Sequence, residues 1–319
     1  MKKFILVAVA FSIAFAFTSC KKDGQFSPKE KIKSIYLQGS IEYDKPFFSE
    51  WNGSCAKYLD EKWTWDGKKL KTIDSYNTDG SLYETIQLTY DSKDRFDRII
   101  YSDYQLQFRY DGSKLAGIDA YVGTSINQSY TFTYDGKHIS RVDFVNYNSN
   151  KEYTEEMKKY NPLSLLFDRE IANNMMNFVN YTAKKTRGMT TGSYTLTWSK
   201  NNISNISGTI TSSSATTSIS EDYEYDSHKN PQFGFYHGFS STFMSENNIT
   251  GMRSTLTQGT IRIDENITIN YTYKGDFPQI ATKVHHGVDT DGYRYYTYYN
   301  NDPEYYPSYT RTTITEYQY

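Results

Sequence analysis

The sequence predicts an all-β fold with a minor helical part: a long antiparallel up-and-down meander that curls into a barrel-like or half-barrel sheet. Tyrosine accounts for 32 of the 319 residues, beside 18 Phe and 4 Trp. Tyrosine and threonine suit strands that pack on one face and meet water on the other. An aromatic hairpin motif also recurs along the chain, and its copies are spaced for consecutive hairpins.

The recurring motif consists of two aromatic or apolar residues at positions i and i+2, followed by a turn sequence such as Asp-Gly. Residues at i and i+2 share one face of a strand. Asp-Gly tolerates the positive φ angles of a tight hairpin turn. Each copy therefore predicts one β-hairpin. The second aromatic residue of each clear copy is Trp65, Tyr90, Tyr110 or Tyr134, and weaker copies end at Trp198, Tyr225 and Tyr273.

An apolar pair spaced three residues apart follows most of the turns. The pairs are Leu70/Ile73, Leu115/Ile118, Ile139/Val142 and Ile203/Ile206. A spacing of three breaks the period of two of a regular strand, so it predicts a β-bulge or a strong local twist after the turn. The Asn-Asn steps at 201–202 and 247–248 are expected to be turns, since asparagine tolerates positive φ.

The spacing of the motif indicates how many strands the sheet contains. The anchors at 65, 90, 110 and 134 lie 25, 20 and 24 residues apart, which is enough for two strands and two turns. Hairpin loops join antiparallel neighbours, so we expect an up-and-down sheet of roughly 14–18 strands. A sheet of that length must curl, close or be covered.

Two longer inserts contain an Asn-Pro step followed by bulky apolar residues. After Asn161-Pro162, apolar residues at spacings of three and four from Leu163 to Val179 predict one amphipathic helix. After Asn230-Pro231, glycines interrupt the apolar pattern, so a short helix with irregular flanks is expected. We expect one or two short helices to fill the concave side of the sheet. The alternative role for such a Met and Phe stripe is a ligand groove.

The N-terminus predicts export and a lipid anchor. Lys2 and Lys3 precede an apolar run over 4–17 and then Cys20, an arrangement that resembles a bacterial lipobox. The alternative is an ordinary signal peptide with a chance cysteine. We therefore expect a signal peptide over 1–19, lipidation of Cys20, a flexible tether over 20–29 and a single β-repeat domain over 30–319.

Charge and cysteine content exclude several classes of partner. Removing residues 1–19 takes away two of the 35 basic residues and leaves 33 against 37 acidic ones, a formal charge of about −4. This balance does not favour nucleic acid as a partner. With Cys20 acylated, Cys55 has no partner for a disulfide, and we expect it to be buried as a small hydrophobic residue. No cofactor is indicated.

Motifs that would indicate catalysis or a metal site are missing. The sequence contains no Gly-x-Ser-x-Gly elbow, His-Glu-x-x-His helix, phosphate-binding glycine loop or Cys-x-x-Cys pair. His285 and His286 are adjacent, so on a strand they face opposite sides and are not expected to share a metal ion. We predict no enzyme. A glycoside-acting enzyme stays the alternative, because its two carboxylates leave no local motif.

A cluster of tyrosines close to the C-terminus is the candidate binding site. Alternation along a strand places aromatic residues of this cluster on both faces, so some are expected to be exposed. Exposed rings with hydroxyl groups suit sugars and protein partners alike, and the alternative is a packing role. The candidates are Tyr293, Tyr295, Tyr296, Tyr298, Tyr299, Tyr305 and Tyr306, with Tyr309 beyond them.

A membrane-spanning barrel is the alternative to a barrel that is only anchored. Spanning strands need apolar residues at alternate positions facing lipid. Arg311, Thr313 and Thr315 share a face with Tyr317 and Tyr319, and polar residues interrupt most other strands in the same way. The sequence therefore favours a barrel held to the membrane by its acyl groups alone.

Together, the lipobox, the aromatic hairpins, the Asn-Pro inserts and the Asn-Asn-Ile-Thr turn resemble a family of Bacteroidetes lipoproteins. The family is grouped under a domain of unknown function, number 4595, and its fold is described as porin-like. The hairpins are also loosely similar to tyrosine-aspartate repeats. The resemblance implies a barrel around internal helices and an outer-membrane location, on either the surface or the periplasmic face.

The function that the sequence favours is that of a non-catalytic cell-envelope lipoprotein. We expect it to bind glycan or protein through exposed aromatic residues. A purely structural envelope protein and the glycoside-acting enzyme are the alternatives.

Overall fold

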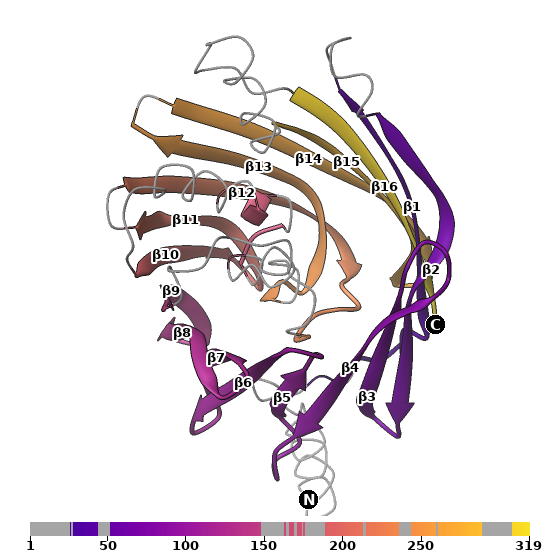
Figure 1. Ribbon diagram of the computed structural model, residues 1–319, viewed down its shortest axis with the longest axis horizontal. Helices are drawn as coiled ribbons and strands as arrows, with labels where there is room; N and C mark the ends of the chain where they lie inside the picture. The colour runs from indigo at the N-terminus through magenta and orange to yellow at the C-terminus, as the bar shows by residue number, and fades with distance from the viewer. Residues whose placement is uncertain are drawn as a thin grey trace, which may run out of the picture.

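The chain folds into a closed β-barrel of 16 antiparallel strands. The computed structural model describes residues 26, 28–43, 52–147, 163, 166–168, 171–173, 175, 189–212, 215–235, 244–259, 261–288 and 308–319. Figure 1 shows the strands following one another round a ring in chain order, from indigo β1 to yellow β16. The strands are β1 (Ser34–Tyr43), β2 (Gly53–Asp66), β3 (Lys69–Tyr76), β4 (Leu82–Tyr90), β5 (Phe96–Ile100), β6 (Tyr104–Asp111), β7 (Lys114–Val122), β8 (Ser125–Asp135), β9 (His138–Asn146), β10 (Thr190–Ser199), β11 (Asn202–Ser212), β12 (Ala215–Lys229), β13 (Asn247–Gln258), β14 (Ile261–Lys274), β15 (Phe277–Val288) and β16 (Ser308–Gln318).

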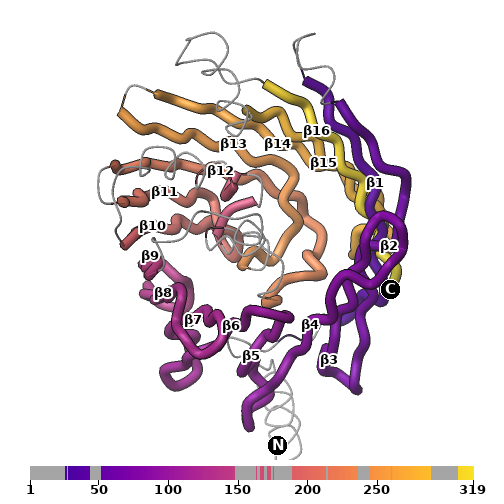
Figure 2. The backbone as a smooth tube through the Cα atoms, viewed as in Figure 1, coloured from indigo at the N-terminus to yellow at the C-terminus, as the bar shows by residue number. Residues whose placement is uncertain are grey.

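The barrel closes where the first strand pairs with the last. β1 and β16 run antiparallel in continuous register from the pair Ser34 and Gln318 to the pair Tyr43 and Tyr309. In Figure 2 the indigo and yellow tubes lie side by side along this seam. The up-and-down meander and the strand number predicted from the sequence are confirmed, and of the two shapes left open the sheet takes the closed barrel.

The aromatic motifs form the predicted hairpins and bulges. The turn glycines Gly67, Gly112 and Gly136 have φ angles of 53°, 58° and 59°, which suit glycine at a tight turn. Trp63 pairs with Ile73 while Trp65 pairs with Leu70, so β3 carries an extra residue opposite β2. The same register shift recurs where β6 meets β7, β8 meets β9, and β10 meets β11. The apolar spacing of three is therefore the sequence signature of a bulge.

The second aromatic residue of each motif has a polar role that the sequence pattern alone did not reveal. The Tyr90 hydroxyl donates a hydrogen bond to the backbone carbonyl of Leu70 at 2.8 Å, and the Tyr134 hydroxyl donates to that of Leu115 at 2.9 Å. In the same way, the Trp198 indole Nε1 donates to the carbonyl of Ile139 at 2.7 Å. Each acceptor directly precedes the unpaired bulge residue of the preceding hairpin. Neighbouring hairpins are thus linked one to the next by their aromatic side chains.

Cations cover several of these rings. The Lys69 ammonium lies 5.3 Å from the Tyr90 ring centroid, and the Lys114 ammonium lies 4.7 Å from that of Tyr134. Each lysine directly precedes the carbonyl acceptor of the same ring. Cation–π contact and hydrogen bond therefore hold each ring from one neighbouring hairpin.

Replacing Tyr90 with phenylalanine should lower the free energy of unfolding by about 0.5–1.5 kcal/mol, because the ring stays and one hydrogen bond is lost. Denaturant unfolding of the purified protein measures the change. Tyr147→Phe is the matched control, since the Tyr147 side chain is 50% exposed and its loss of a hydroxyl should cost little. Equal stabilities of the two variants would contradict a structural role for the Tyr90 hydroxyl.

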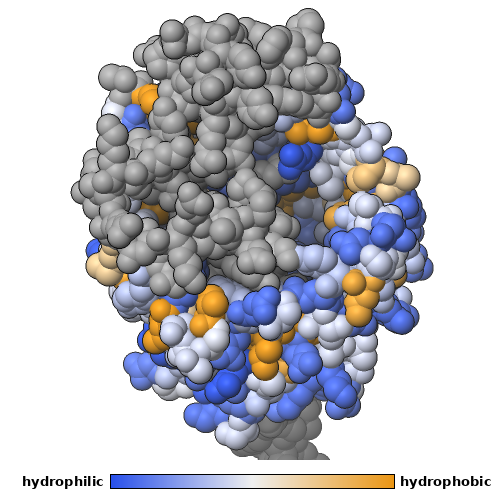
Figure 3. Space-filling view, viewed as in Figure 1, coloured by the Kyte–Doolittle hydropathy of each residue, from blue (hydrophilic) through white to orange (hydrophobic). Residues whose placement is uncertain are grey.

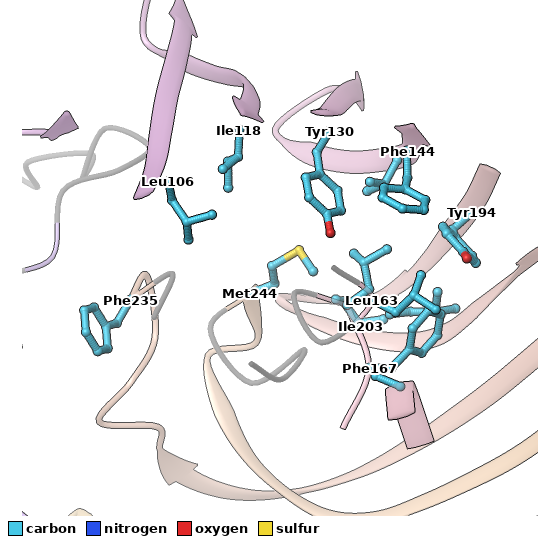
Figure 4. Close-up of a cluster of buried hydrophobic side chains, with 14 of the residues drawn as sticks. Leu106, Ile118, Tyr130, Phe144, Leu163, Phe167, Tyr194, Ile203, Phe235 and Met244 are labelled. Atoms are coloured by element: carbon cyan, nitrogen blue, oxygen red, sulfur yellow. The ribbon is translucent and has the colours of Figure 1, made fainter. Parts of the chain in front are cut away.

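The interior of the barrel is packed with apolar side chains from the wall and from the connection after β9. Leu163, Phe167 and Met175 are 0% exposed. The Phe167 ring meets the ring of Tyr194 on β10 edge to face, with the centroids 5.3 Å apart. Figure 4 shows Leu163, Phe167 and Met244 gathered among side chains of the wall. Short helical segments inside the barrel confirm the prediction for its concave side.

The single amphipathic helix expected after Pro162 is not continuous. Leu163 is in a 3-10 conformation, residues 166–168 form a turn and bend, and α-helical structure is described only at 171–173 and 175. The Asp168 carbonyl accepts the first helical hydrogen bond, from the Ala172 amide at 2.8 Å. The apolar periodicity was correct about burial, because a segment enclosed on all sides by the barrel wall buries its residues whether or not it is helical.

The segment between β12 and β13 and the residues before β1 meet at one end of the barrel. Residues 231–234 form a turn, which fits the irregular flank expected there, and residues 236–243, where a short helix is expected, lie outside the described residues. Phe235 is 1% exposed and stacks on Phe26, with ring centroids 4.7 Å apart. Phe26 falls within the predicted tether over 20–29, yet its ring is only 3% exposed and lies 5.9 Å from that of Trp65. Both segments therefore contribute to the core.

The first Asn-Asn step forms part of the expected turn, since Asn201 lies in the turn between β10 and β11, whereas both residues of the second step lie in β13. The turn between β10 and β11 is centred one residue earlier, where Lys200 has a φ of 57°, while Asn202 and Asn247 begin strands. The side-chain amide of Asn202 donates to the side-chain carbonyl of Asn247 at 2.9 Å. The backbone amide of Asn247 donates in return to Asn202 Oδ1 at 3.0 Å. The asparagines thus connect β11 to β13 by side chains, a long-range contact that local turn preference cannot indicate.

The outer wall of the barrel is polar. Along β14 the outward residues Arg262, Asp264, Asn266, Thr268 and Asn270 are exposed, while the residues between them face the core or are half-buried. β12 alternates in the same way, and Thr216, Ser218, Ser220, Asp222 and Glu224 are its exposed residues on the outside. The described part of the surface in Figure 3 is mostly blue and white, with scattered orange. A lipid-facing barrel needs an outward apolar band, and these strands place their apolar residues inside.

Candidate functional site

The two ends of the barrel differ in the connections that they carry. At one end, which we call the hairpin end, lie the tight turns at Gly67, Gly112, Gly136 and Gly275. At the other, the loop end, lie the long connections between β1 and β2, β9 and β10, and β15 and β16. β1 begins at the hairpin end, because its last residue, Tyr43, leads into the first long connection.

Exposed apolar side chains gather at the loop end. Among the residues that the structure describes, seven large hydrophobic side chains are exposed, and all but Phe233 lie within two residues of a strand terminus at that end or just beyond it. The six are Leu82, Tyr83, Val122, Ile126, Tyr147 and Met189. Such a gathering on an otherwise polar protein is typical of an interaction surface.

The site residues predicted from the sequence lie mostly outside the described residues. Cys20 does, and so do Tyr293, Tyr295, Tyr296, Tyr298, Tyr299, Tyr305 and Tyr306, which belong to the connection between β15 and β16. Tyr309 is described and is 6% exposed, so it belongs to the barrel interior. Its ring meets that of His285 edge to face, with the centroids 5.4 Å apart and the planes at 86°.

The adjacent histidines face opposite sides of β15, as strand alternation predicts. His285 is 0% exposed inside the barrel, and His286 is exposed on the outer wall. Within the part of the chain that the structure describes, no group of three His, Cys, Asp or Glu side chains is placed to hold a metal ion.

A cluster of buried polar side chains faces the lumen on the side of the barrel formed by β12 to β16. Glu221 is 0% exposed and Glu265 is 3% exposed, and each is in register with Ser254 on the strand between them. The His285 Nε2 atom lies 3.5 Å from a carboxylate oxygen of Glu265. These two carboxylates are enclosed in the wall packing, unlike the exposed pair in a cleft that a glycoside-acting enzyme would require.

Burial raises the pKa of the Glu221 carboxyl group well above its usual range. The negative charges of Asp168 and Glu265 raise the pKa further, and the nearby hydroxyl groups of Tyr223 and Ser254 oppose the shift. Asp168 lies inside the barrel, where its carboxylate forms an ion pair with the Lys283 ammonium at 2.7 Å. Glu221 therefore favours the neutral, protonated state over a wider pH range than an exposed glutamate does.

Sequence reasoning missed this cluster, although a signal for it exists. Glu221 stands between Ile219 and Tyr223 in a strand that alternates strictly, and Glu265 stands between Ile263 and Ile267. In both strands, period-two alternation places the carboxylate on the apolar, inward face. An acidic residue in phase with buried neighbours is the pattern that identifies such a site.

Next to this cluster the lumen contains a cavity of about 460 Å³ between β15, β16, β1 and β2. Leu37, Gly39 and Cys55 line it, together with the cationic side chains of Lys283 and Arg311. Inward residues here are half-exposed, whereas Leu115 and Ile118 on the opposite wall are 0% exposed. Cys55 is thus more exposed than the buried position expected from the sequence, because it faces open space and not packed core.

None of the helical segments within the described ranges is long and apolar enough to cross a membrane.

Comparisons with known proteins add little beyond the fold. No protein-family model and no curated protein matches this chain. Among solved structures, it is similar to a porin-like protein from Bacteroides vulgatus, with 10% identity, a TM-score of 0.43, and coverage of 90% of this chain and 98% of that one. It is also similar to a porin-like protein from Bacteroides uniformis, with 10% identity, a TM-score of 0.30, and coverage of 91% and 99%.

Both solved structures are called porin-like, the fold description that the sequence resemblance implied. Likeness at these scores carries no argument about function, and the family assignment stays a prediction.

Proposed function

We propose that this chain is a non-catalytic envelope protein, held at the outer membrane by an acylated Cys20, which binds a glycan or a protein with its loop end. The observation that supports the proposal is the gathering of exposed apolar side chains at that end of a barrel whose outer wall is polar. The sequence supplies the second argument, since Tyr293, Tyr295 and Tyr296, which lie outside the described residues, belong to the connection between β15 and β16.

The anchor and the binding face lie at opposite ends in this proposal. Cys20 precedes β1, and β1 begins at the hairpin end, so the acyl groups hold the hairpin end toward the membrane. The loop end then points away from the membrane and meets ligands without steric conflict. In this arrangement the polar outer wall of the barrel faces water. Its ion pairs, such as that between Arg262 and Asp264, are then hydrated.

The binding face is tested by replacing Tyr293, Tyr295 and Tyr296 together with serine in the full chain. We expect binding to a glycan array, or cross-linking to envelope proteins on intact cells, to fall strongly. Phe233→Ser is the matched control, because Phe233 is 39% exposed but lies at the hairpin end. Equal loss in both variants would contradict a binding face at the loop end.

The alternatives predict other results in the same experiment. Turnover of an array glycan would favour a glycoside-acting enzyme, and the absence of any bound glycan or cross-linked protein would favour a purely structural role. Protease accessibility of an epitope-tagged copy on intact cells then decides on which face of the outer membrane the protein lies. Digestion would indicate the outer surface, and protection the periplasmic side.

The anchor is tested separately by Cys20→Ala. We expect the variant to lose acyl labelling and to leave the membrane fraction, since no other part of the proposal holds the chain to a bilayer. Detergent phase separation and labelling with an alkyne fatty acid measure both properties. Cys55→Ala is the control and should retain label and membrane association. A Cys20→Ala protein that stays membrane-bound without label would contradict the lipid anchor.

A further inference from the structure

Two hollows lie next to each other on the outer wall of the barrel, over β12, β13 and β14. Figure 1 shows these strands as neighbours on one side of the ring. The hollow near the hairpin end has a volume of about 630 Å³, and the other has about 440 Å³. Both volumes lie within the roughly 300–1,000 Å³ that is typical of ligand sites. We call the two hollows together the wall groove.

The wall groove is lined by outward side chains that strand pairing places in rows. Arg253 pairs with Asp222 on β12 and with Asn266 on β14. Paired residues face the same side of a sheet, so these three side chains form one row across the outer wall. All three are exposed and line the smaller hollow.

The next row toward the hairpin end is low in its centre, because its middle residue is a glycine. Gly251 pairs with Glu224 on β12 and with Thr268 on β14. Neighbouring rows lie two residues apart along each strand, or about 7 Å. The low centre at Gly251 lies between the two hollows and makes them continuous. A Cβ atom added there would lie 3.2 Å from Glu224 Oε2, so a larger side chain would extend into the wall groove.

β13 and β14 part beyond this row, which deepens the wall groove toward the hairpin end. Gly251 and Thr268 are the last pair between these strands, while β14 stays paired with β15 as far as Lys274. The Tyr271 hydroxyl spans the gap and donates to the backbone carbonyl of Ile249 at 2.8 Å. The larger hollow lies over this gap, since Tyr271 is among its lining residues.

A pair of stacked rings lies at the hairpin end of the wall groove. The ring centroids of His228 and Tyr273 are 3.8 Å apart, and the ring planes meet at 12°. Asp226 lies beside them, and its carboxylate accepts hydrogen bonds from the Tyr273 hydroxyl and, at 3.3 Å, from the Asn248 side-chain amide. His228, Tyr273 and Asp226 all line the larger hollow. The wall groove therefore offers an aromatic surface next to a hydrogen-bond acceptor.

The charges of the wall groove favour a neutral ligand. Arg253 forms an ion pair with Glu224, and Asp264 forms one with Arg262 at 2.9 Å. Asp222 accepts a hydrogen bond from a side-chain amide of β11 at 2.8 Å. Carboxylates outnumber arginines among the described lining residues, so an anionic ligand is disfavoured. These carboxylates also do not converge on one point, and no metal-binding group of three is found in the described part of the chain.

We propose that the wall groove binds a neutral oligosaccharide. Asn266, Thr268 and Asn270 are exposed along about 13 Å of β14, and their amides and hydroxyl donate and accept hydrogen bonds as sugar hydroxyls do. The apolar face of a sugar ring packs on the rings of His228 and Tyr273. A peptide strand fits less well, because β13 is paired on both sides along the two rows and offers no open edge there. This site is additional to the loop end and does not depend on it.

Affinity electrophoresis in native gels tests the site with the full chain carrying Cys20→Ala. Each gel contains one soluble polysaccharide, with galactomannan, xyloglucan and amylopectin as neutral probes and polygalacturonate as the anionic probe. We expect at least one neutral probe to retard the protein in a concentration-dependent way, and polygalacturonate to leave its mobility unchanged. Labelled hexalysine, followed by fluorescence anisotropy, is the probe for a basic peptide and should not bind.

Two variants with matched controls locate the binding. Gly251→Leu should abolish retardation by filling the low centre, whereas Thr195→Leu adds the same side chain to the outer face of β10 and should behave as the parent does. His228→Ala should weaken binding about 3- to 10-fold, the loss of one stacking contact. His138→Ala is its control, since the His138 ring stacks on Trp198 outside the wall groove, with the centroids 4.4 Å apart.

Several results would overturn this site. They are unchanged mobility with every neutral probe, equal retardation by polygalacturonate, retained binding in Gly251→Leu, His228→Ala binding like His138→Ala, or hexalysine binding that Gly251→Leu abolishes. Far-ultraviolet circular dichroism of each variant verifies that the barrel is intact. The variant with serine at 293, 295 and 296 should bind the neutral probe as the parent does, so a failure of this site is distinguished from a failure of the loop-end site.

Discussion

Replacing Phe96 with alanine should lower the free energy of unfolding by about 3–5 kcal/mol, the range for truncating a fully buried phenylalanine. Phe96 is 0% exposed at the start of β5. Its ring centroid lies 5.2 Å from that of Tyr90, 5.8 Å from that of Phe108 and 6.0 Å from that of Phe235. The large loss follows because these rings come from separate elements and cannot all move in to fill the cavity.

Denaturant unfolding followed by tryptophan fluorescence measures this change, with Phe233→Ala as the matched control. Phe233 is 39% exposed and belongs to the segment that also carries Phe235. Its truncation should change the free energy of unfolding by no more than about 0.5 kcal/mol. A Phe96→Ala protein as stable as the control would refute the packing of the hairpin end around Phe96.

Replacing Glu221 with glutamine should stabilise the protein increasingly as the pH rises above the ordinary glutamate pKa of 4.5. Burial first, and then the charges of Asp168 and Glu265, raise the pKa of Glu221 in the folded state. The folded state therefore keeps a proton that the unfolded chain releases near its own, lower pKa. The stability contributed by this proton is fully present below 4.5 and is lost as the pH rises toward the folded pKa.

Glutamine is neutral at every pH, so the variant removes this loss. The slope of the unfolding free energy against pH should differ from that of the parent by up to about 1.4 kcal/mol per pH unit in that range. Unfolding in denaturant at a series of pH values from acid to neutral measures the slopes. Glu224→Gln, which removes an exposed carboxylate from the same strand, is the matched control. Parallel curves for Glu221→Gln and the parent would contradict a raised pKa.

The hairpins and bulges could be predicted because their determinants are local. The spacing of Leu70 and Ile73, three residues apart just after Gly67, predicted the bulge that the register between β2 and β3 shows. The second Asn-Asn step, at 247–248, was misassigned for the opposite reason. Asn202 and Asn247 are 45 residues apart and bond to each other, and this partner, not turn propensity, decides their conformation.

The predicted binding tyrosines lie outside the described residues, so their role stays a prediction. The structure instead identified two features that the sequence search passed over, the buried carboxylates of β12 and β14 and the cavity beside Arg311. The carboxylates were detectable in the sequence, because each lies at an alternate strand position between two apolar residues that face inward. The cavity was not, because it depends on how four strands from the two ends of the chain come together.

By itself, the sequence determined the all-β class, the antiparallel hairpin repeat and the face of each strand that is apolar, because these follow from periodicity and turn chemistry over a few residues. Only the tertiary structure decided that the sheet closes, that the apolar face is the inner one, and that a cavity lies beside the seam. Closure pairs Ser34 with Gln318. Such pairing depends on the number, twist and register of all 16 strands together. A local stretch of sequence therefore cannot indicate whether the first and last strands meet.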